Sequence, residues 1–585
     1  MTIKSTLDTL PLLPPIVRSS AIASNAVYTV EAIGLALVGL FLYLYTYRAW
    51  TLSYKNLRGP PAEHFLWGNV PTFLRAPPNA PHGEWMKVYG PTFRYRIILG
   101  TNRFFTADPV ALSYILGHGD LFPKPERTRK GMEDMLGNGV LVAEGHDHKR
   151  QRKVLNPSFS PAAVRGMMPI FYDKAYQLRD KFFSLIEGDP EDLATNGEFL
   201  SPTPPKEIDI VPGTKKIDVL SWLGKTTLDV IGLAGFNYDF RALEDPKNEL
   251  ADAYRKMFGA SMEITVGAII QAIVPFMRHI PTKRVRTVKE SRDVTRRIGQ
   301  RLIEEKKKAI SSVHAGGRQL EKNEDIGNDL LSILIKANMA ADLRPDQKMT
   351  DEEVLAQITT FMLAGNETSS TALTWILYEL AKDPDAQKRL RDEVAGVPDE
   401  RPSLETLNSL PYLDAVIREV LRLCAPAPST MRECVQDVVV PLGTPVKGRD
   451  GKMIENVRLT KGTAMLIPIL NVNTSPDIWG PDAAVFNPDR FLKSDDPSST
   501  SANVIPGVWG NLLTFLGGTR NCIGYRFALA EIKVILFVLI RGFEFEELRS
   551  KPEIERKSSV VMRPRVVGEE KAGLQMPLLV RPVSA

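Results

Sequence analysis

The sequence predicts a mainly α-helical protein with small β-sheets, in which one large domain follows a single membrane-spanning helix. Several long segments repeat apolar residues at the i, i+3, i+4 and i+7 spacing of an amphipathic helix. Strand-like runs are short, as in Phe93–Leu99 and Val435–Pro441. The expected long helices are Glu352–Lys382, Gln387–Ala395, Tyr412–Leu423 and Tyr525–Phe545.

One uncharged stretch near the N-terminus, AIGLALVGLFLYLYTY, runs from Ala32 to Tyr47. As a helix it covers about 24 Å, slightly less than a bilayer core. Either the charge of Arg48 must therefore extend to the interface, or Glu31 must lie near the opposite interface. A cleaved signal peptide is the rival, but it begins with basic residues and ends in small ones, whereas Arg48 and Trp50 follow this stretch. We therefore expect a membrane anchor at residues 26–50.

Basic residues around this stretch predict its orientation. Arg48, Lys55 and Arg58 follow it, and Arg18 alone precedes it within about 20 residues. The bulk of the chain should therefore face the cytosol. The expected segments are a short non-cytosolic stretch at 1–25, the anchor at 26–50, a proline-rich linker at 51–82 and the large domain at 83–585.

Composition excludes several classes of function. The net charge of +5 is spread over 74 basic and 69 acidic residues, which argues against nucleic-acid binding. Cys424, Cys434 and Cys522 are odd in number and lack C-x-x-C spacing, so neither a disulfide framework nor a structural zinc site is expected. Residues 187–214, 311–328 and 494–507, rich in Ser, Pro, Gly and charge, are expected to be surface loops or insertions.

A decapeptide near the C-terminus, FLGGTRNCIG, surrounds one cysteine with glycines directly before an apolar helical stretch. Its three glycines can adopt positive φ and bring the backbone close to a flat object, and Arg520 places a cation two residues from Cys522. A thiolate held in this way can ligate a metal through one bond. A glycine-rich turn with an incidental cysteine is the alternative.

The decapeptide is similar to the haem-binding signature of the cytochrome P-450 superfamily. The resemblance implies the fold of that superfamily, with a single large haem domain, and haem b as the cofactor. It also implies that Cys522 is the axial thiolate ligand of the iron. The resemblance extends over roughly residues 60–582, and the anchor and insertions are similar to those of fungal members. The matching positions are Phe515, Gly518, Arg520, Cys522 and Gly524.

A second motif, AGNETS at residues 364–369, interrupts the apolar pattern of the helix predicted at Glu352–Lys382. Gly costs about 1 kcal/mol within a helix, and the Thr hydroxyl can bond a carbonyl one turn back, which favours a local kink. In the similar family this segment crosses the distal face of haem, and an acid and an alcohol deliver protons to bound dioxygen. The resemblance assigns these catalytic roles to Glu367 and Thr368. A surface-exposed polar turn is the alternative, and the apolar flanks disfavour it.

The tetrapeptide EVLR places Glu419 and Arg422 at i and i+3 of a predicted helix, where they can pair. Such pairs are common on surfaces and worth little there. The resemblance assigns this pair a structural role, because Arg490 of FNPDRF stands where the family closes a buried Glu-Arg-Arg network behind the haem. We expect the three residues to serve folding and haem retention.

The basic stretch HDHKRQRK, residues 146–153, lacks the further ligand that a metal site would need. In the similar family this helix often has Trp-x-x-x-Arg facing a haem propionate, and here the corresponding residues are His148 and Arg152. Arg520 and Arg432 are the other expected propionate partners, because Arg suits charge-assisted bonds to carboxylates.

The chain has no visible nucleotide-binding motif. Val219 stands where a phosphate loop ending in GKTT would need its first glycine, and no G-x-G-x-x-G follows a strand. Electrons must therefore come from another protein. The resemblance indicates the microsomal type, served at the endoplasmic reticulum membrane by an NADPH-dependent flavoprotein reductase. The cations expected at its docking face are Lys149, Arg150, Lys153 and Arg526.

The function that the resemblance implies is a monooxygenase. It would use O2 and NADPH-derived electrons to hydroxylate or epoxidise a bulky lipophilic substrate, such as a terpenoid, another secondary metabolite or a polycyclic aromatic xenobiotic. The expected pocket walls are Phe122–Val142, Phe361–Ala364 and Pro426–Met431, which are mostly apolar. The alternatives are an isomerase or dehydratase of a peroxide and a membrane-tethered haem carrier or sensor, and both would leave Glu367 and Thr368 unused.

Overall fold

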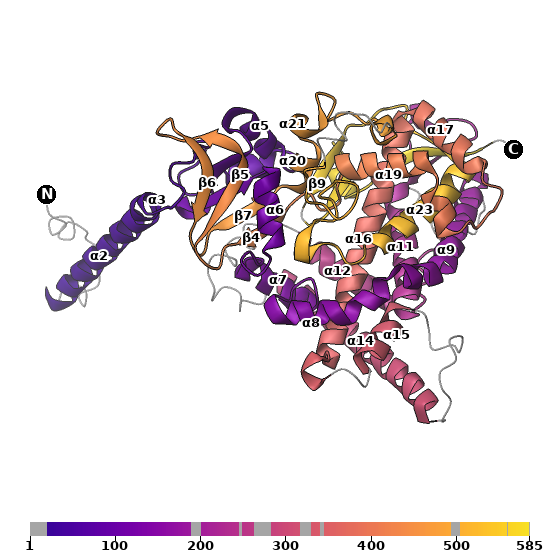
Figure 1. Cartoon of the computed structure of the whole chain (residues 1–585), viewed down its shortest axis with the longest axis horizontal. Coiled ribbons are helices and arrows are strands. Elements are labelled where there is room, and N and C mark those ends of the chain that lie inside the picture. Colours follow the sequence, from indigo (N-terminus) through magenta and orange to yellow (C-terminus); the bar gives the residue numbers. More distant parts are fainter. Residues whose placement is uncertain are drawn as a thin grey trace.

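A mainly helical body carries one projecting helix at its N-terminal end, and the described residues form four small sheets (Figure 1). This arrangement confirms the predicted fold class. The computed structural model describes residues 20–188, 201–244, 248–262, 282–315, 329–339, 344–492, 503–558 and 560–583.

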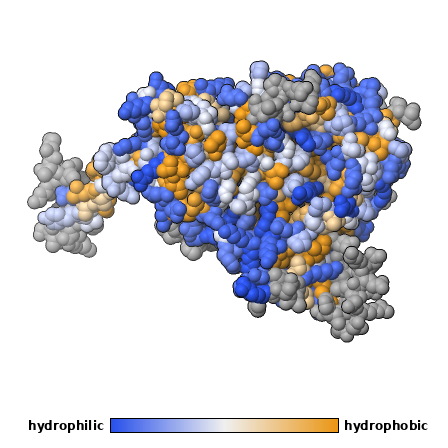
Figure 2. Space-filling view, in the orientation of Figure 1, coloured by the Kyte–Doolittle hydropathy of each residue, from blue (hydrophilic) through white to orange (hydrophobic). Residues whose placement is uncertain are grey.

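The projecting helix consists of α2 (Ser20–Phe41), a π-helical turn (Leu42–Tyr47) and α3 (Arg48–Trp50). Its segment Tyr28–Trp50 is, within the described residues, the one helix long and apolar enough to cross a membrane. Figure 2 shows apolar residues along the described part of this projection, beside a body whose surface mixes hydrophilic and apolar residues. The helix is thus a candidate membrane anchor. Of the expected segment 1–25, residues 1–19 lie outside the described part.

Residues 51–82 pack on the body, although their prolines favoured a linker. Tyr54 and Leu57 are buried in the core, and the backbone carbonyl of Arg58 accepts a hydrogen bond from the Arg94 N–H at 3.1 Å. The segment also forms α4 (Val70–Arg75) and begins α5 (Ala80–Tyr89), each with a proline in its first turn. Proline fits a helix start as well as a linker, because the N–H that it lacks has no partner there.

The sheet next to the anchor is built from distant parts of the chain. Its strand order is β1-β2-β7-β4, and β2 and β7 run parallel. A hairpin of β5 and β6 follows β4 in sequence. The expected strand 93–99 ends earlier, because Leu99 has a left-handed φ of 53°. The bounds are β1 Thr92–Arg96, β2 Asn102–Thr106, β4 Thr430–Glu433, β5 Val438–Lys447, β6 Met453–Leu459 and β7 Ala464–Ile467.

Helix α16 (Asp351–Lys382) runs through the centre of the body (Figure 1). It begins with a capping box, in which Thr350 and Glu353 each accept a hydrogen bond from the other's backbone. The predicted helices agree closely with α16, α17 (Pro384–Ala395) and α19 (Pro411–Leu423). The last one, α23, covers Tyr525–Gly542 and ends before Phe545, because the chain becomes extended at Phe543 and pairs as β8 with β11.

The remaining elements complete the helical body around α16. Of the predicted surface loops, residues 189–200, 316–328 and 494–502 lie outside the described part, whereas 311–315 continue a helix. The other helices are α6 Pro109–Gly117, α7 Glu126–Leu136, α8 Gly145–Leu155, α9 Pro161–Glu187, α11 Val219–Phe236, α12 Glu249–Met262, α14 Lys283–Ala315, α15 Leu330–Met339, α18 Leu404–Asn408, α20 Ile469–Asn473 and α21 Pro476–Trp479. The other strands are β3 Lys215–Asp218, β8 Phe543–Glu546, β9 Ile554–Ser558, β10 Met562–Val566 and β11 Pro577–Pro582.

Candidate functional site

Cys522 lies in the loop that enters α23. Its backbone N–H donates to the carbonyl of Phe515 at 2.8 Å, which closes the loop. Burial raises the pKa of the Cys522 thiol, and the N–H of Gly524, which donates to the sulfur, opposes this rise. The 18-residue helix α23 begins at Tyr525. A helix N-terminus and an N–H donor both favour the thiolate. The loop therefore offers a hydrogen-bond donor and a helix N-terminus to the sulfur, which oppose the effect of burial.

The Cys522 side chain faces a space inside the protein. The side chain is exposed, yet burial is the main cause that raises the pKa of the thiol. These two observations agree if the exposed face opens onto a cavity enclosed by protein. Ala364 is likewise exposed in the middle of α16. The ring of Phe159 packs on Phe361 of α16 and would lie 3.5 Å from a Cβ placed on Gly524. From these exposures we infer an open space between α16 and the Cys522 loop, which would fit a flat prosthetic group.

The glycines of FLGGTRNCIG have a different use from the predicted one at two positions. Gly518 has a φ of 66°, and a Cβ there would lie 2.0 Å from the carbonyl oxygen of Leu116. A Cβ on Gly517 would lie 1.6 Å from the carbonyl oxygen of Pro506. These two glycines thus let the loop approach the protein's own backbone, which the prediction of a close approach to a flat object did not include.

A buried cluster of cations surrounds a single carboxylate, Glu144. Arg520 forms an ion pair with Glu144 and donates to the carbonyl of Ala143 at 2.7 Å. Lys124 lies 3.3 Å from Glu144, and burial lowers the pKa of its ammonium to about 8. Arg432 is buried beside them, and burial lowers its pKa to about 10. Three cations and one carboxylate leave this region short of negative charge, which fits the two propionates of haem.

His148 and Arg152 lie on α8, beside the same cluster. Burial is the main cause that lowers the pKa of His148 to about 3, and Arg520 adds to it, so the imidazole is neutral and has one N–H to donate. Arg152 instead holds the cysteine loop: its guanidinium donates to the carbonyl oxygen of Asn521 at 2.6 Å and to Oδ1 of Asn521 at 2.7 Å. Its charge also lowers the pKa of Cys522. Arg152 therefore supports the loop, a contact that the propionate assignment did not predict.

Glu367 and Thr368 are both half-buried at the centre of α16. The Thr368 hydroxyl donates to the carbonyl of Ala364 at 2.5 Å, the bond one turn back that the motif predicts. Glu367 forms an ion pair with Arg563 of β10. Burial lowers the pKa of Arg563 to about 10. The acid and the alcohol thus have different partners, and α16 continues as a helix through this segment.

The predicted Glu-Arg-Arg network is assembled. Oε1 of Glu419 lies 2.7 Å from Nη2 of Arg422, and both side chains are completely buried. Nε of Arg490 lies 3.6 Å from Oε2 of Glu419. Arg490 is also paired with Asp482 at 2.7 Å, and Arg422 donates to the carbonyl of Ala483 at 2.5 Å. The network therefore ties α19 to the segment that precedes the cysteine loop.

Sequence reasoning missed four members of these groups: Lys124, Glu144, Asp482 and Arg563. None of them lies in a recognisable motif. Arg563 and Glu367 are almost two hundred residues apart. An ion-pair search along one helix at i, i+3 or i+4 spacing cannot find partners of this kind.

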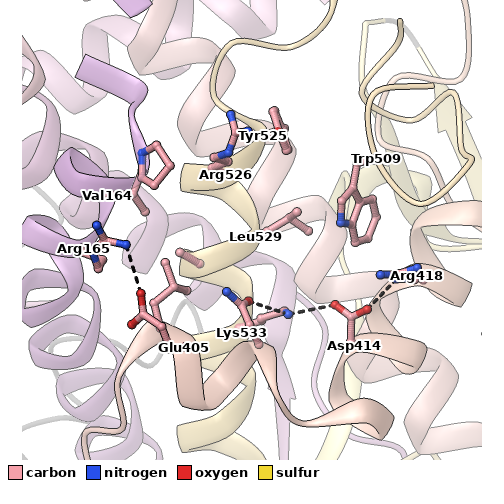
Figure 3. A pocket seen from close by; sticks show the side chains of 14 residues that line it. Val164, Arg165, Glu405, Asp414, Arg418, Trp509, Tyr525, Arg526, Leu529 and Lys533 are labelled. Atoms are coloured by element: carbon pink, nitrogen blue, oxygen red, sulfur yellow. Dashed lines mark hydrogen bonds and ion pairs between the residues drawn. The ribbon is translucent and has the colours of Figure 1, made fainter. Parts of the chain in front are cut away.

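A surface hollow of about 380 Å³ lies beside the outer end of the cysteine loop (Figure 3). Trp509, Tyr525 and Leu529 form part of its wall, and the Trp509 ring meets the edge of Phe515 at a centroid distance of 5.6 Å. Arg526 is exposed at this hollow, with its guanidinium 4.5 Å from the centroid of the Tyr525 ring. The hollow therefore reaches the residues that hold Cys522.

Most of the charges at this hollow are paired. Arg165 contacts Glu405 at 3.1 Å, and Asp414 contacts both Arg418 at 2.6 Å and Lys533 at 2.9 Å (Figure 3). Arg526 has no carboxylate partner among the described residues.

The cations expected on α8 differ from one another in their environment. Lys149 is exposed and pairs with Asp120 at 2.6 Å. Arg150 is largely buried and donates to Glu353 at 3.1 Å. Its charge is therefore neutralised inside the fold. Lys153 is exposed.

Comparison with known proteins shows which family has this architecture. The family model described as cytochrome P450 matches residues 58–567. The chain belongs to the cytochrome P450 family. Cytochrome P450 monooxygenase 128 of Postia placenta is 42% identical over 536 residues, which cover 91% of this chain and 93% of that protein. Cytochrome P450 monooxygenase 205 of the same fungus is 41% identical over the same shares.

A relative from a second fungus, cytochrome P450 monooxygenase claW of Ampulloclitocybe clavipes, is 34% identical over 91% of this chain and 93% of that protein. This P450 is therefore a monooxygenase with fungal homologues. Membership of the family implies a haem cofactor, a redox partner and dioxygen.

Proposed function

We propose that this P450 holds haem b through Cys522 and oxidises a bulky lipophilic substrate with dioxygen and NADPH-derived electrons. One observation carries the proposal: the exposed thiol of Cys522 lies next to the N-terminus of α23, where it accepts a hydrogen bond from the Gly524 N–H and feels the charge of Arg152. The bound cofactor supplies oxygen activation and transfer to the substrate. The protein supplies the ligand, the proton path and the pocket.

Four side chains would hold the propionates. Arg520, Arg432 and Lys124 offer charged donors, and His148 offers a neutral N–H. Glu144 already neutralises part of this charge. Two further carboxylates would bring the cluster close to electrical balance, which supports the assignment.

Protons would reach the distal side through Thr368 and Glu367. The Thr368 hydroxyl donates its one proton to the carbonyl of Ala364 and keeps a lone pair that can accept a hydrogen bond, so it would hold a proton-carrying water in place. Glu367 would hold the next proton, and its ion pair with Arg563 would keep the carboxylate in place. An isomerase or dehydratase acting on a peroxide, or a haem carrier, would have no use for this pair.

The proton path is tested by Thr368→Ala. We expect faster peroxide release and less product for each NADPH consumed, because the proton delivery that completes oxygen cleavage is impaired. The matched control is Thr374→Ala, two turns further along α16, whose buried hydroxyl donates to Ser370. If the coupling of NADPH to product is unchanged in Thr368→Ala, the assignment is wrong.

The substrate class follows from the expected walls of the pocket. Phe361–Ala364 and Pro426–Met431 are mostly apolar, which suits a terpenoid, another secondary metabolite or a polycyclic aromatic xenobiotic. Hydroxylation and epoxidation are both within the chemistry of such a site. Substrate-induced spectral shifts across a panel of these classes would identify the best ligand.

The redox partner would be an NADPH-dependent flavoprotein reductase. The hollow of Figure 3 supports this, because Arg526 and the Trp509 and Tyr525 rings lie next to the cysteine loop. Of the cations expected on α8, Lys153 is exposed, whereas Lys149 is paired with Asp120 and Arg150 with Glu353. An acidic protein surface would complement the exposed cations.

The location would be the endoplasmic reticulum membrane, with one span and the catalytic domain in the cytosol. The exposed apolar segment Tyr28–Trp50 supports the span. Arg48, Lys55 and Arg58 after it support the orientation.

The deciding experiment replaces the ligand. We expect Cys522→Ser to abolish the red-shifted absorption band of the reduced, carbon monoxide-bound protein. Cys434→Ser is the control, because Cys434 is a buried thiol that donates to the carbonyl of Gln436 at 2.7 Å. Persistence of the band in Cys522→Ser would place the axial ligand elsewhere.

A further inference from the structure

A second hollow, of about 440 Å³, lies where the chain leaves the candidate anchor and meets the turn between β5 and β6. Three cations line it, and no carboxylate does. Three of the lining residues are glycines, so backbone atoms form part of its wall. The lining residues are Arg58, Gly59, Tyr89, Lys447, Gly448, Arg449 and Gly451.

The backbone of this hollow is held in place by Asn56. Its carbonyl accepts the N–H of Arg449 at 2.8 Å, and its Oδ1 accepts the N–H of Asp450 at 3.2 Å. Leu57 forms a bridge with Gly448, and the guanidinium of Arg58 lies 5.7 Å from the centroid of the Tyr89 ring. The anchor-proximal segment and the β5–β6 turn therefore form one fixed surface.

The positive charge of the hollow has no matching negative charge. Arg58, Lys447 and Arg449 are all exposed, and within the described residues none of them forms an ion pair. The carboxylate of the nearby Asp450 accepts a hydrogen bond within its own turn instead, from the N–H of Lys452 at 3.1 Å. Burial lowers the pKa of the Arg94 guanidinium, and repulsion from the charge of Arg449 lowers it further. An anion from outside the chain would relieve this repulsion.

The hollow lies close to the end of the candidate anchor. Arg58 follows Trp50 by eight residues, which span at most about 28 Å. The actual distance is shorter than this limit, because the chain turns back and Nζ of Lys55 donates to the carbonyl of Trp50 at 3.1 Å. The anchor is also fixed to the body, because the rings of Tyr45 and Phe65 stack at 4.5 Å. Figure 1 shows β5 and β6 beside the point where α3 joins the body.

We propose that this hollow binds the phosphate of an anionic phospholipid headgroup in the bilayer that holds the anchor. The proposal rests on the membrane location proposed above. Guanidinium and ammonium groups are the natural donors to a phosphate, and basic residues next to a span are attracted to anionic lipid. Binding there would fix the rotation of the catalytic domain about the anchor.

The test uses the full-length haem protein in phosphatidylcholine nanodiscs with a trace of spin-labelled phosphatidylserine or spin-labelled phosphatidylcholine. The electron paramagnetic resonance signal of lipid held at the protein gives the relative association of the two lipids. We expect at least about fivefold preference for phosphatidylserine, the effect of one basic residue at a membrane surface. The triple variant Arg58→Gln, Lys447→Gln, Arg449→Gln should bind the two lipids equally.

The matched control removes the same charge elsewhere, with Lys256→Gln, Lys551→Gln and Lys571→Gln at three exposed positions, and should keep the preference. An unchanged carbon monoxide spectrum shows that each variant is folded. Equal binding of both lipids by the unmodified protein, or an undiminished preference in the hollow variant, would overturn the proposal.

Two further observations separate the sources of failure. Failure of the protein to insert into pure phosphatidylcholine would disprove the anchor itself, which the headgroup proposal needs. Millimolar inorganic phosphate, matched in ionic strength with chloride, should leave the preference intact. If free phosphate abolishes it and chloride does not, the hollow binds free phosphate and the assignment to a lipid is wrong.

Discussion

Arg563 of β10 forms an ion pair with Glu367 at the centre of α16. Strand β10 is itself held in place, because the N–H of Met562 donates to the carbonyl of Pro426 at 2.8 Å. The indole N–H of Trp375 donates to the Met562 carbonyl at 2.9 Å. The guanidinium therefore reaches the acid of the proposed proton path from a rigid support. Arg563 is a positioning residue for that acid.

The first prediction concerns this pair. Glu367→Gln and Arg563→Gln should each destabilise the protein, because each leaves a half-buried charge without its partner. The double variant should lose less than the sum, with a coupling free energy of about 0.5–3 kcal/mol. Thermal unfolding of the four proteins measures it. The exposed pair Lys388–Asp392 is the control, for which coupling below about 0.5 kcal/mol is expected. Strict additivity at Glu367 and Arg563 would contradict the pairing.

A second prediction follows from the contacts of Arg152 with Asn521. Arg152→Lys keeps the charge but loses the two-pronged contact that holds the cysteine loop. We expect about tenfold faster transfer of haem to an acceptor protein, the usual cost of removing a group that orients a metal ligand. The red-shifted band of the reduced carbon monoxide complex should also decrease. Arg165→Lys, at a half-exposed position on α9, should change neither. Wild-type haem retention in Arg152→Lys would show that the clamp has no role.

The third prediction is a pH dependence of stability caused by Glu531 of α23. This carboxyl is fully buried beside Ser369, and neither of its oxygens makes a hydrogen bond of standard geometry among the described residues. Burial raises its pKa from 4.5 to about 8. Between these two values the folded state binds more protons than the unfolded state, so this group lowers stability as pH rises.

The variant Glu531→Gln has no charge to bury and should be the more stable protein at pH 8. The two proteins should converge below pH 4.5, where the carboxyl becomes protonated in the unfolded state as well as in the folded state. Midpoints of thermal unfolding across this range provide the measurement. Glu405→Gln, at an exposed position, should not change the pH dependence in this way. If the difference in unfolding midpoint between Glu531→Gln and the unmodified protein stays constant across this pH range, the burial of this carboxyl is not the cause of the pH dependence.

The fourth prediction concerns the fully buried pair of Glu419 and Arg422. Glu419→Ala leaves the guanidinium of Arg422 buried without its carboxylate, and this should cost about 3–5 kcal/mol. We expect little folded haem protein at ordinary growth temperature. Glu400→Ala, at an exposed position, should leave the yield intact. The yield of haem-containing protein after purification distinguishes them, and a normal yield for Glu419→Ala would show that the network is dispensable.

Local patterns predicted the helices well because each depends on neighbouring residues. The apolar spacing of 352–382 appears as α16, and the residues of EVLR form the predicted pair on α19. Boundaries were less accurate where tertiary contacts decide them. The expected helix through Phe545 stops at Gly542, because Phe543–Glu546 pairs with β11 instead.

The site was predicted in part. The bond from Thr368 to Ala364 and the pair of Glu419 and Arg422 depend on spacing within one helix, and both are present. The pairing of Arg563 with Glu367 could not be read in this way, because it joins a strand to a helix far away in the chain. Glu144 is similar, since its partners Lys124 and Arg520 come from two segments far apart in the sequence.

The sequence by itself determined the fold class, the candidate anchor and the signature around Cys522, because these depend on hydrophobic periodicity and on residues adjacent in the chain. Only the tertiary structure decided which charges neutralise one another and which do not. It paired Arg150 with Glu353, placed Arg152 on Asn521, and brought Lys447 and Arg449 next to Arg58. The physical reason is that an ion pair depends on distance in space, and chain separation does not set that distance until the core has packed.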